Sequence, residues 1–181
     1  MLDLKDRPCC VVGGGEVAGR KARTLAGCGA RVTVVSPSLS AGLRRMVSSG
    51  KAVHIRSLFR PALLKGFFAV IAATDDPAVN ASVSATALKS SMLVNVVDVP
   101  AASNFIVPAS VSRGGIIISI STSGKAPCLA RRIRLDLEKK FVPRYAARLK
   151  SVGKARRALK KRVADPAERR RIMTRLARSG S

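Results

Sequence analysis

Short apolar runs alternate with segments of helical periodicity over the first hundred residues of the chain. Segments rich in apolar and β-branched residues predict strands at residues 9–12, 31–35, 53–55, 67–73 and 92–99. The uninterrupted apolar run at residues 67–73 is typical of a strand that is buried on both faces of a sheet. Apolar residues at helical spacing predict helices at residues 16–26, 41–49 and 78–89, with a brief helix before Gly66. This alternation predicts an α/β fold built on a doubly wound parallel sheet with right-handed crossovers.

The regular alternation of predicted strands and helices ends at Pro100. Residues 104–111 and 116–121 predict two strands, and the short turn Arg113-Gly114-Gly115 favours an antiparallel hairpin outside the parallel sheet. Pro127 is placed to open a helix that ends near residue 141, and residues 144–176 predict basic helices interrupted near Pro166. We therefore expect three regions: a parallel-sheet domain at 1–103, a hairpin-plus-helix region at 104–142 and a basic helical region at 143–181.

A glycine turn joins the first predicted strand to the first predicted helix. Gly13, Gly15 and Ala18 fit the dinucleotide-binding spacing G-x-G-x-x-G/A. Gly13 allows the tight bend, the missing Cβ of Gly15 lets the backbone approach a pyrophosphate, and Ala18 lets the helix pack closely. The phosphates would meet the free N–H groups at the start of the helix. The sequence thus predicts a Rossmann-type dinucleotide site; the alternative is a glycine turn that only connects two elements.

Polar side chains follow several of the other predicted strands. In many NAD sites an acid after the second strand holds the ribose, but Ser36-Pro37-Ser38 stands here without one. The Ser38 hydroxyl or backbone groups could replace it, and the residues leave the choice between NAD and NADP open. Thr74-Asp75-Asp76 and Asp98 follow two later strands, and Asp76 is also placed to cap the next helix. Because ligands bind beyond the carboxyl ends of parallel strands, we expect all these groups beside the glycine turn.

Asp98 is the candidate for proton transfer. A carboxylate at the rim of a cofactor cleft can accept a proton while a hydride leaves toward a nicotinamide; the alternative is an Asp that caps a helix or stabilises a turn. Lys125, beside Thr122 and Ser123, could contact a carboxylate or a phosphate.

His54 is the only histidine, which argues against Ser-His-Asp and Cys-His catalysis. The four cysteines form no C-x-x-C pair, so we expect no metal site.

The formal net charge of +24 is concentrated in the last part of the chain. Residues 131–181 hold 19 of the 34 Lys and Arg but only 4 of the 10 Asp and Glu. This surface predicts an anionic partner, either nucleic acid, an acidic lipid face or a polycarboxylate substrate; the alternative is a solvated helical surface. One Tyr and no Trp argue against base stacking and so against nucleic acid.

No apolar run approaches the about 20 residues of a membrane span. The first residues do not resemble a secretory signal, so we expect a cytoplasmic protein without a membrane partner.

An ordered series of motifs extends from residue 4 to residue 138. It comprises Val11-Val12-Gly13-Gly14-Gly15-Glu16-Val17-Ala18, Val34-Val35-Ser36-Pro37, Ala72-Ala73-Thr74-Asp75-Asp76, Asn95-Val96-Val97-Asp98, Phe105-Ile106-Val107-Pro108 and Ser121-Thr122-Ser123-Gly124-Lys125-Ala126-Pro127. As a set, these motifs resemble the precorrin-2 dehydrogenase/sirohydrochlorin ferrochelatase family, which also forms the N-terminal module of sirohaem synthases. The resemblance is thin after Pro143.

The resemblance implies an enzyme of sirohaem biosynthesis that oxidises precorrin-2 to sirohydrochlorin with NAD as the hydride acceptor. Some members also insert ferrous iron to make sirohaem, and the sequence leaves that activity open. Asp98 matches the family's acid/base aspartate, Thr122, Ser123 and Lys125 would lie near the tetrapyrrole, and residues 104–142 would form a homodimer interface. The resemblance also implies that the glycine turn with Glu16 and Val17, and the Pro37-Ser38 segment, hold NAD. With Thr74 and Asp75 from the sheet edge, the cofactor-binding set is Gly13, Gly14, Gly15, Glu16, Val17, Pro37, Ser38, Thr74 and Asp75. The competing hypothesis, motivated by the basic tail, is a nucleotide-sensing or nucleic-acid-binding module.

Overall fold

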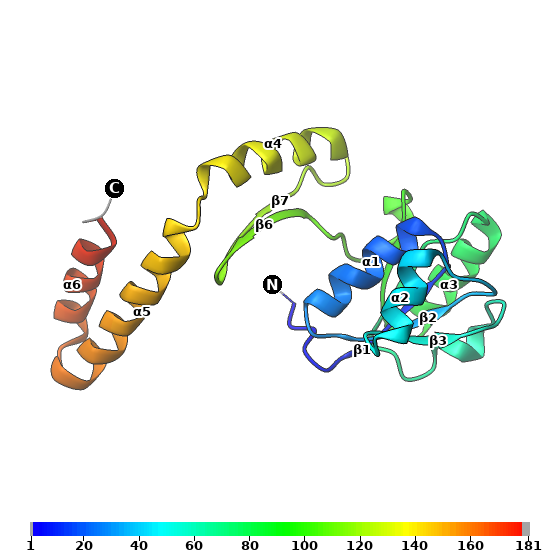
Figure 1. Cartoon of the computed structure of the whole chain (residues 1–181), viewed down its shortest axis with the longest axis horizontal. Coiled ribbons are helices and arrows are strands. Elements are labelled where there is room, and N and C mark those ends of the chain that lie inside the picture. The colour runs from blue at the N-terminus through cyan, green and yellow to red at the C-terminus, as the bar shows by residue number, and fades with distance from the viewer. Residues whose placement is uncertain (1, 179–181) are drawn as a thin grey trace. The chain divides into compact units, whose positions relative to one another are not determined.

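The computed structural model describes residues 2–178, and the chain divides into two compact units, Met1–Val107 and Pro108–Ser181. The first unit holds a five-stranded parallel sheet in the order β3-β2-β1-β4-β5 (Figure 1). Its strands are β1 (Pro8–Val12), β2 (Arg31–Val35), β3 (Val53–Ile55), β4 (Ala69–Ala72) and β5 (Leu93–Val96). Its helices are α1 (Glu16–Gly27), α2 (Ala41–Ser48) and α3 (Pro77–Lys89), with short 3₁₀ turns η1 (Pro61–Leu64) and η2 (Pro100–Ala102). The predicted α/β class and doubly wound parallel sheet are confirmed.

Two apolar layers cover the two faces of this sheet. Alternate residues of β1 point to opposite sides: Cys9 belongs to the cluster formed with α1 and α2, and Cys10 to the cluster formed with α3 and η1. Because both faces of the central strands are buried, β4 (AVIA) carries apolar residues at every position rather than at alternate ones. Burial raises the pKa of the Cys10 thiol to about 12, so Cys10 packs as a small hydrophobe rather than reacting as a thiolate.

The last two strands of the sheet in chain order, β4 and β5, are shorter than the sequence predicted. β4 covers only part of residues 67–73, and β5 ends at Val96 rather than at residue 99. The residues after β5 turn back, and Asn104 then runs along the outer edge of the strand. The side-chain oxygen of Asn104 accepts from the Val94 N–H at 2.7 Å, and its side-chain amide donates to the Met92 carbonyl at 3.0 Å. The Ser103 hydroxyl accepts from the Val96 N–H at 2.9 Å. Side chains thus occupy the hydrogen-bonding edge of β5 that a further strand would otherwise use.

Asn104→Ala tests the importance of this edge contact. The change leaves the buried Val94 N–H without its protein partner, and we expect a loss of about 1–2 kcal/mol in the free energy of unfolding. Urea unfolding of both proteins measures the difference. Thr24→Ala is the control, because Thr24 makes an exposed side-chain bond within α1 and its loss should stay within about 0.5 kcal/mol. Equal stabilities of Asn104→Ala and the parent chain would contradict the expectation.

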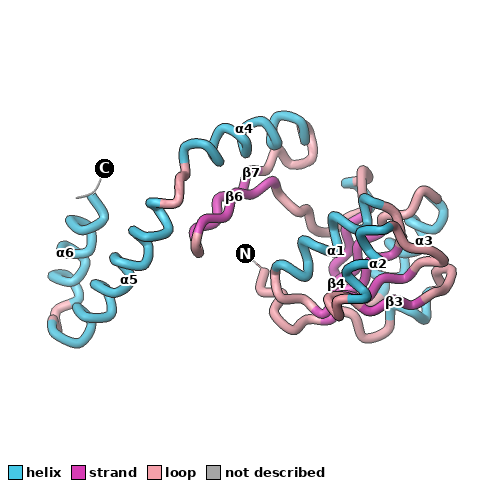
Figure 2. The backbone as a smooth tube through the Cα atoms, viewed as in Figure 1, coloured by secondary structure: helices cyan, strands magenta, loops and turns pink. Residues whose placement is uncertain are grey.

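The second unit consists of a hairpin followed by three helices (Figure 2). The antiparallel hairpin pairs β6 (Ala109–Arg113) with β7 (Ile116–Ile120), and α4 (Pro127–Lys140), α5 (Arg144–Arg162) and α6 (Pro166–Arg178) follow. The hairpin confirms the predicted pairing. Its first strand, however, begins only at Ala109, because Ser103 and Asn104 are bound to β5 instead. The two-residue turn has positive φ at both Gly114 (56°) and Gly115 (102°), which fits the twist of a tight hairpin.

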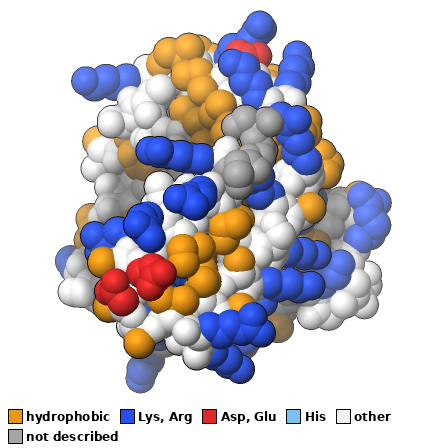
Figure 3. Space-filling view, turned by 90° about the vertical axis from the view of Figure 1, so that its left-hand side faces the viewer, with side chains coloured by type: hydrophobic (Ala, Val, Ile, Leu, Met, Phe, Trp, Pro, Cys, Tyr) orange, Lys and Arg blue, Asp and Glu red, His pale blue; other side chains and the backbone are white. Residues whose placement is uncertain are grey.

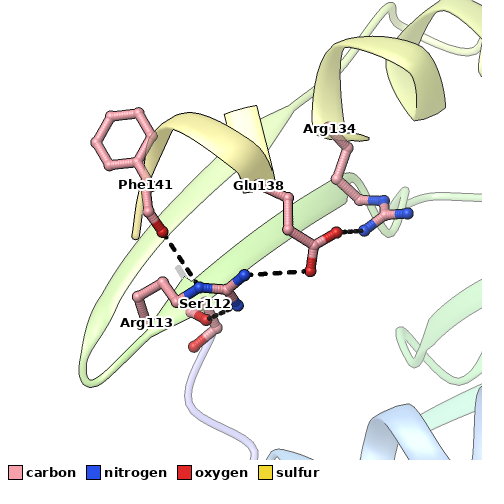
Figure 4. A network of polar contacts seen from close by, with 5 residues as sticks. All are labelled: Ser112, Arg113, Arg134, Glu138 and Phe141. Atoms are coloured by element: carbon pink, nitrogen blue, oxygen red, sulfur yellow. Dashed lines mark hydrogen bonds and ion pairs between the residues drawn. The ribbon is translucent and has the colours of Figure 1, made fainter. Parts of the chain in front are cut away.

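A polar network joins the hairpin to the end of α4 (Figure 4). The Arg113 guanidinium donates to the Phe141 carbonyl at 3.2 Å and pairs with Glu138 at 3.4 Å, and Glu138 also pairs with Arg134 at 2.6 Å. The Arg113 guanidinium therefore holds α4 against β6. Because it is engaged in these contacts, it is not available to bind an anionic substrate.

The helices α5 and α6 pack against each other and cap one another. Arg169 of α6 donates to the Val163 and Ala164 carbonyls at the end of α5, at 2.6 and 2.7 Å. Arg148 of α5 donates to the Leu176 and Ala177 carbonyls in the last turn of α6, at 2.9 and 3.1 Å. Each cation thus satisfies carbonyls at the negative end of the other helix.

Among residues 2–178, no helix is both long and apolar enough to cross a membrane.

Candidate functional site

The three glycines between β1 and α1 have different surroundings. A Cβ added to Gly13, whose φ is +125°, would collide with the Ala73 carbonyl at the end of β4. A Cβ on Gly14 would collide with the Ser38 carbonyl and the Ser36 hydroxyl after β2. A Cβ on Gly15 would meet nothing within 4 Å. The first two glycines therefore allow close packing against neighbouring loops, whereas Gly15 faces open space where a ligand can approach.

The start of α1 offers hydrogen-bond donors beside that open space. Gly15 is the N-cap residue and has no side chain to cap the helix, and the first intrahelical bond is donated by Gly19 to the Gly15 carbonyl at 3.0 Å. The N–H groups of the first turn thus remain available, and the positive end of the helix dipole favours an anion there. These are the requirements for holding a pyrophosphate.

The loop after β2 is fixed from within. The buried Ser36 hydroxyl donates to the Ser38 carbonyl at 2.5 Å, and the Ser40 N–H donates to the Gly14 carbonyl at 2.7 Å. The His54 ring contacts the Ser36 carbonyl at 2.9 Å, so His54 helps to hold this loop. Pro37 and Ser38 are exposed at the tip of this loop, so the Ser38 hydroxyl is placed where an acid holds the ribose in other NAD sites.

The loop after β4 is held by an amide that sequence reasoning did not assign to the site. The Asn80 side chain accepts from the N–H and the hydroxyl of Thr74, at 3.2 and 2.8 Å, and donates to the Thr74 carbonyl at 2.9 Å. Asp76 caps α3 as predicted, accepting from the Ala78 and Val79 N–H groups. Asp75 stays exposed. Thr74 is therefore firmly positioned, and Asp75 is free to contact a ligand.

All these loops line one cleft of about 780 Å³ at the carboxyl ends of β1, β2 and β4, within the about 300–1,000 Å³ typical of small-molecule sites. The cleft brings together every residue of the predicted cofactor-binding set: Gly13, Gly14, Gly15, Glu16, Val17, Pro37, Ser38, Thr74 and Asp75. It also includes Ser57, Leu58 and Phe59, which sequence reasoning missed. The only signal for them was their position after β3, at the same end of the sheet.

The charge of the cleft bears on the type of dinucleotide. Its described lining contains Glu16, Asp75 and Asp76 but no Lys or Arg. A 2′-phosphate needs a cation beside it, whereas the ribose hydroxyls of NAD need only acceptors and donors such as Ser38. The lining therefore favours NAD over NADP, a choice that the sequence pattern left open.

Asp98 follows β5 at the same end of the sheet but does not line this cleft. It lies in a turn closed by the Val99 N–H and the Val96 carbonyl, has a φ of +61°, and exposes its side chain. Asp is among the few residues that adopt this left-handed conformation readily. The backbone thus presents a solvated carboxylate beyond the strand ends.

Thr122, Ser123 and Lys125 belong to the second unit, in the turn between β7 and α4. The Thr122 hydroxyl accepts from the Ala126 N–H at 3.2 Å and its carbonyl accepts from the Lys125 N–H at 3.0 Å, so Thr122 shapes the turn. Ser123, with a φ of 52°, and Lys125 are exposed. The turn therefore offers one hydroxyl and one ammonium group to solvent. Within residues 2–178, no group of three or more His, Cys, Asp or Glu side chains that could hold a metal is found.

The parallel sheet, the glycine turn and the cleft at its switch point define a Rossmann-type dinucleotide-binding protein. Comparison with known families agrees: residues 1–109 match the family described as "Putative NAD(P)-binding", and residues 113–140 match "Sirohaem biosynthesis protein central". The chain belongs to this NAD(P)-binding family of sirohaem biosynthesis proteins, which confirms the resemblance given by its motifs.

Individual relatives support this assignment. The sirohaem synthases of Methylobacillus flagellatus and Photobacterium profundum are 43% and 44% identical over 93% and 94% of this chain. The chain spans 36% of the length of each of these relatives. The solved structure of "SirC, precorrin-2 dehydrogenase" is 31% identical, with a TM-score of 0.82 over 97% of this chain and 87% of that one.

Proposed function

We propose that the protein oxidises precorrin-2 to sirohydrochlorin with NAD as the hydride acceptor, in the cytoplasm, as a step of sirohaem biosynthesis. The observation that carries the proposal is the cleft itself, in which all nine predicted cofactor-binding residues meet around an open Gly15. The similarity to a precorrin-2 dehydrogenase over most of both chains supplies the substrate.

The residues of the cleft fit NAD. The N–H groups of the first turn of α1 would hold the pyrophosphate, Ser38 the ribose, and the Ser57–Phe59 side of the cleft the adenine. When bound, NAD supplies the acceptor for the hydride. The chain itself fixes the loops: Gly13 and Gly14 pack them together, and Asn80 holds Thr74 at the rim.

Removal of a hydride from precorrin-2 must be accompanied by loss of a proton to form the new double bond. We assign that proton to the Asp98 carboxylate, which is exposed beyond β5 at the cofactor end of the sheet. Precorrin-2 carries acetate and propionate groups, and Lys125 can pair with one of them while Ser123 donates a hydrogen bond. The net charge of +24 raises the local concentration of such a polycarboxylate.

The assay for this proposal is direct. The chain, mixed with precorrin-2 and NAD, is expected to form NADH and sirohydrochlorin in equal amounts. Binding of NAD without turnover would instead favour the nucleotide-sensing module, and failure to bind NAD would reject both. Insertion of ferrous iron into sirohydrochlorin stays a prediction of the resemblance, to be tested by supplying both and following sirohaem.

We further propose that the second unit forms a homodimer. Ile117 of β7 and Leu129 and Leu135 of α4 are 48%, 52% and 40% exposed. Several large apolar side chains left exposed on a hairpin and its helix are typical of an interface. Analytical ultracentrifugation is expected to give the mass of two chains, and Ile117→Lys to shift the protein toward one. A monomer at all micromolar concentrations would contradict this.

A further inference from the structure

The basic helices α5 and α6 are not used by the proposed reaction, yet residues 144–178 carry half of the net charge of +24. Residues 144–178 include 14 Lys and Arg and only two acids, Asp165 and Glu168. Asp165 is occupied as the cap of α6, where it accepts from the Ala167 and Glu168 N–H groups at 2.9 and 3.2 Å. Figure 3, which faces this end of the chain, shows Lys and Arg spread over the surface with only isolated acids. Such a surface repels itself unless an anion binds to it.

The charges of α6 are sorted onto one side of the helix. Successive residues turn by about 100°, so four arginines and the residues between them fall on one arc: Ala167, Arg170, Arg171, Thr174, Arg175 and Arg178. The same residues, with Pro166, line a shallow hollow along the helix. The opposite side carries Ile172 and Met173, which are half-buried, and Arg169, which caps α5. The apolar side of α6 thus packs on α5, although Leu176 on that side stays 37% exposed, and the arginine side faces solvent.

The four arginines of this face have no partner in the described chain. None of the ion pairs among residues 2–178 involves them, and no hydrogen bond holds their guanidinium groups. Arginine forms two parallel hydrogen bonds to a phosphate and is less strongly hydrated than lysine, which suits it to phosphate recognition. Arg170 and Arg178 lie eight residues apart, about 12 Å along the helix. A double helix carries one phosphate charge per about 1.7 Å of its axis, so arginines spread over this length of α6 can contact several phosphates.

From this face we infer that α6 binds the phosphate backbone of double-stranded nucleic acid, without reading its sequence. A membrane surface fits less well, because an interfacial helix needs an exposed apolar side, and that side of α6 packs on α5. The scarcity of aromatic residues argues against stacking on single strands, but contact with a duplex backbone requires no aromatic residue. This inference is independent of the proposed oxidation of precorrin-2.

Binding of the 181-residue chain to a fluorescent duplex, measured by anisotropy from 50 to 200 mM salt, tests the inference. Four phosphate contacts predict a slope of log K against log salt of about −3.6, or a loss on the order of 100-fold over this range. The variant R170Q/R171Q/R175Q/R178Q is expected to lose nearly all of this slope. Duplexes of unrelated sequence are expected to bind equally well.

A matched variant separates this face from general charge. Lys150, Lys154, Arg157 and Lys161 form a stripe on the exposed side of α5, away from α6, and K150Q/K154Q/R157Q/K161Q removes the same four charges. This variant is expected to keep most of the slope, because charges beyond about 8 Å are screened near physiological salt. Equal losses in the two variants would overturn the inference, as would binding to phosphatidylserine vesicles without binding to duplex. Unchanged NAD affinity in both variants shows that the first unit remains folded.

Discussion

Asp98→Asn lowers kcat by about 10²- to 10⁴-fold, the usual contribution of a positioned general base. The substitution removes the proton acceptor but keeps the size of the side chain. It also suits the backbone, because Asn adopts the left-handed conformation at φ +61° as readily as Asp does, whereas Ala would add strain. The affinity for NAD is expected to stay the same, since Asp98 does not line the cofactor cleft. Steady-state kinetics with precorrin-2, together with calorimetric titration of NAD, measure both quantities.

Asp75→Asn provides the matched contrast to this experiment. Asp75 is an exposed carboxylate that lines the cleft, so its loss is expected to change the KM for NAD while kcat is largely kept. If Asp98→Asn retained the parent kcat, Asp98 would have no role as the base. If both variants changed only the KM for NAD, the proton acceptor would have to be sought in the second unit.

Gly15→Val abolishes measurable NAD binding while leaving the fold intact. The added side chain meets no protein atom within 4 Å and sits on extended backbone (φ −77°), so it extends into the space that the pyrophosphate would occupy. A loss of at least about 100-fold in affinity, or about 2.7 kcal/mol, is expected. The free energy of unfolding is expected to change by no more than about 1 kcal/mol, because Gly15 has no side-chain cap bond to lose and the added Cβ collides with nothing.

Gly13→Val is the matched variant with the opposite outcome. Its side chain would collide with the Ala73 carbonyl and adopt a φ of +125°, so a loss of about 3–5 kcal/mol in stability is expected. Urea unfolding and calorimetric titration of NAD on both variants separate the two roles. Tight NAD binding by Gly15→Val would remove the helix terminus from the cofactor site.

The sequence was sufficient to predict the parallel sheet and its cleft for a physical reason. Strands buried on both faces have few polar positions, so an uninterrupted apolar run such as residues 67–73 can be recognised without knowing its neighbours. The glycine turn could also be predicted from the sequence, because a tight bend or a close approach of two backbone segments leaves no room for a side chain. In a parallel sheet the loops after successive strands meet at one edge, so Ser38, Thr74 and Asp75 could be placed beside the glycine turn from topology, whereas Glu16 and Val17 came from the resemblance to the family.

The remaining features depend on contacts between side chains that have no periodic pattern. Asn104 closes the edge of β5, Asn80 holds Thr74, and Arg113 is bound to Glu138, but each partner lies far away in the sequence. An isolated Asn or Arg carries no sign of such a partner. Thr122 shows the same difficulty: the resemblance implies a place near the tetrapyrrole, but nothing in the sequence indicates that its hydroxyl also accepts from the Ala126 N–H and shapes the turn before α4.

The reciprocal capping by Arg148 and Arg169 makes the ends of α5 and α6 depend on each other. Helix ends normally fray one residue at a time, with small local opening free energies. Here, fraying of the last turn of α6 releases Arg148 from Leu176 and Ala177, and opening of the first turn of α6 removes Arg169 from the end of α5. We therefore expect the last turn of α5 to open together with the first turn of α6 rather than to fray by itself, and amide hydrogen exchange measures this.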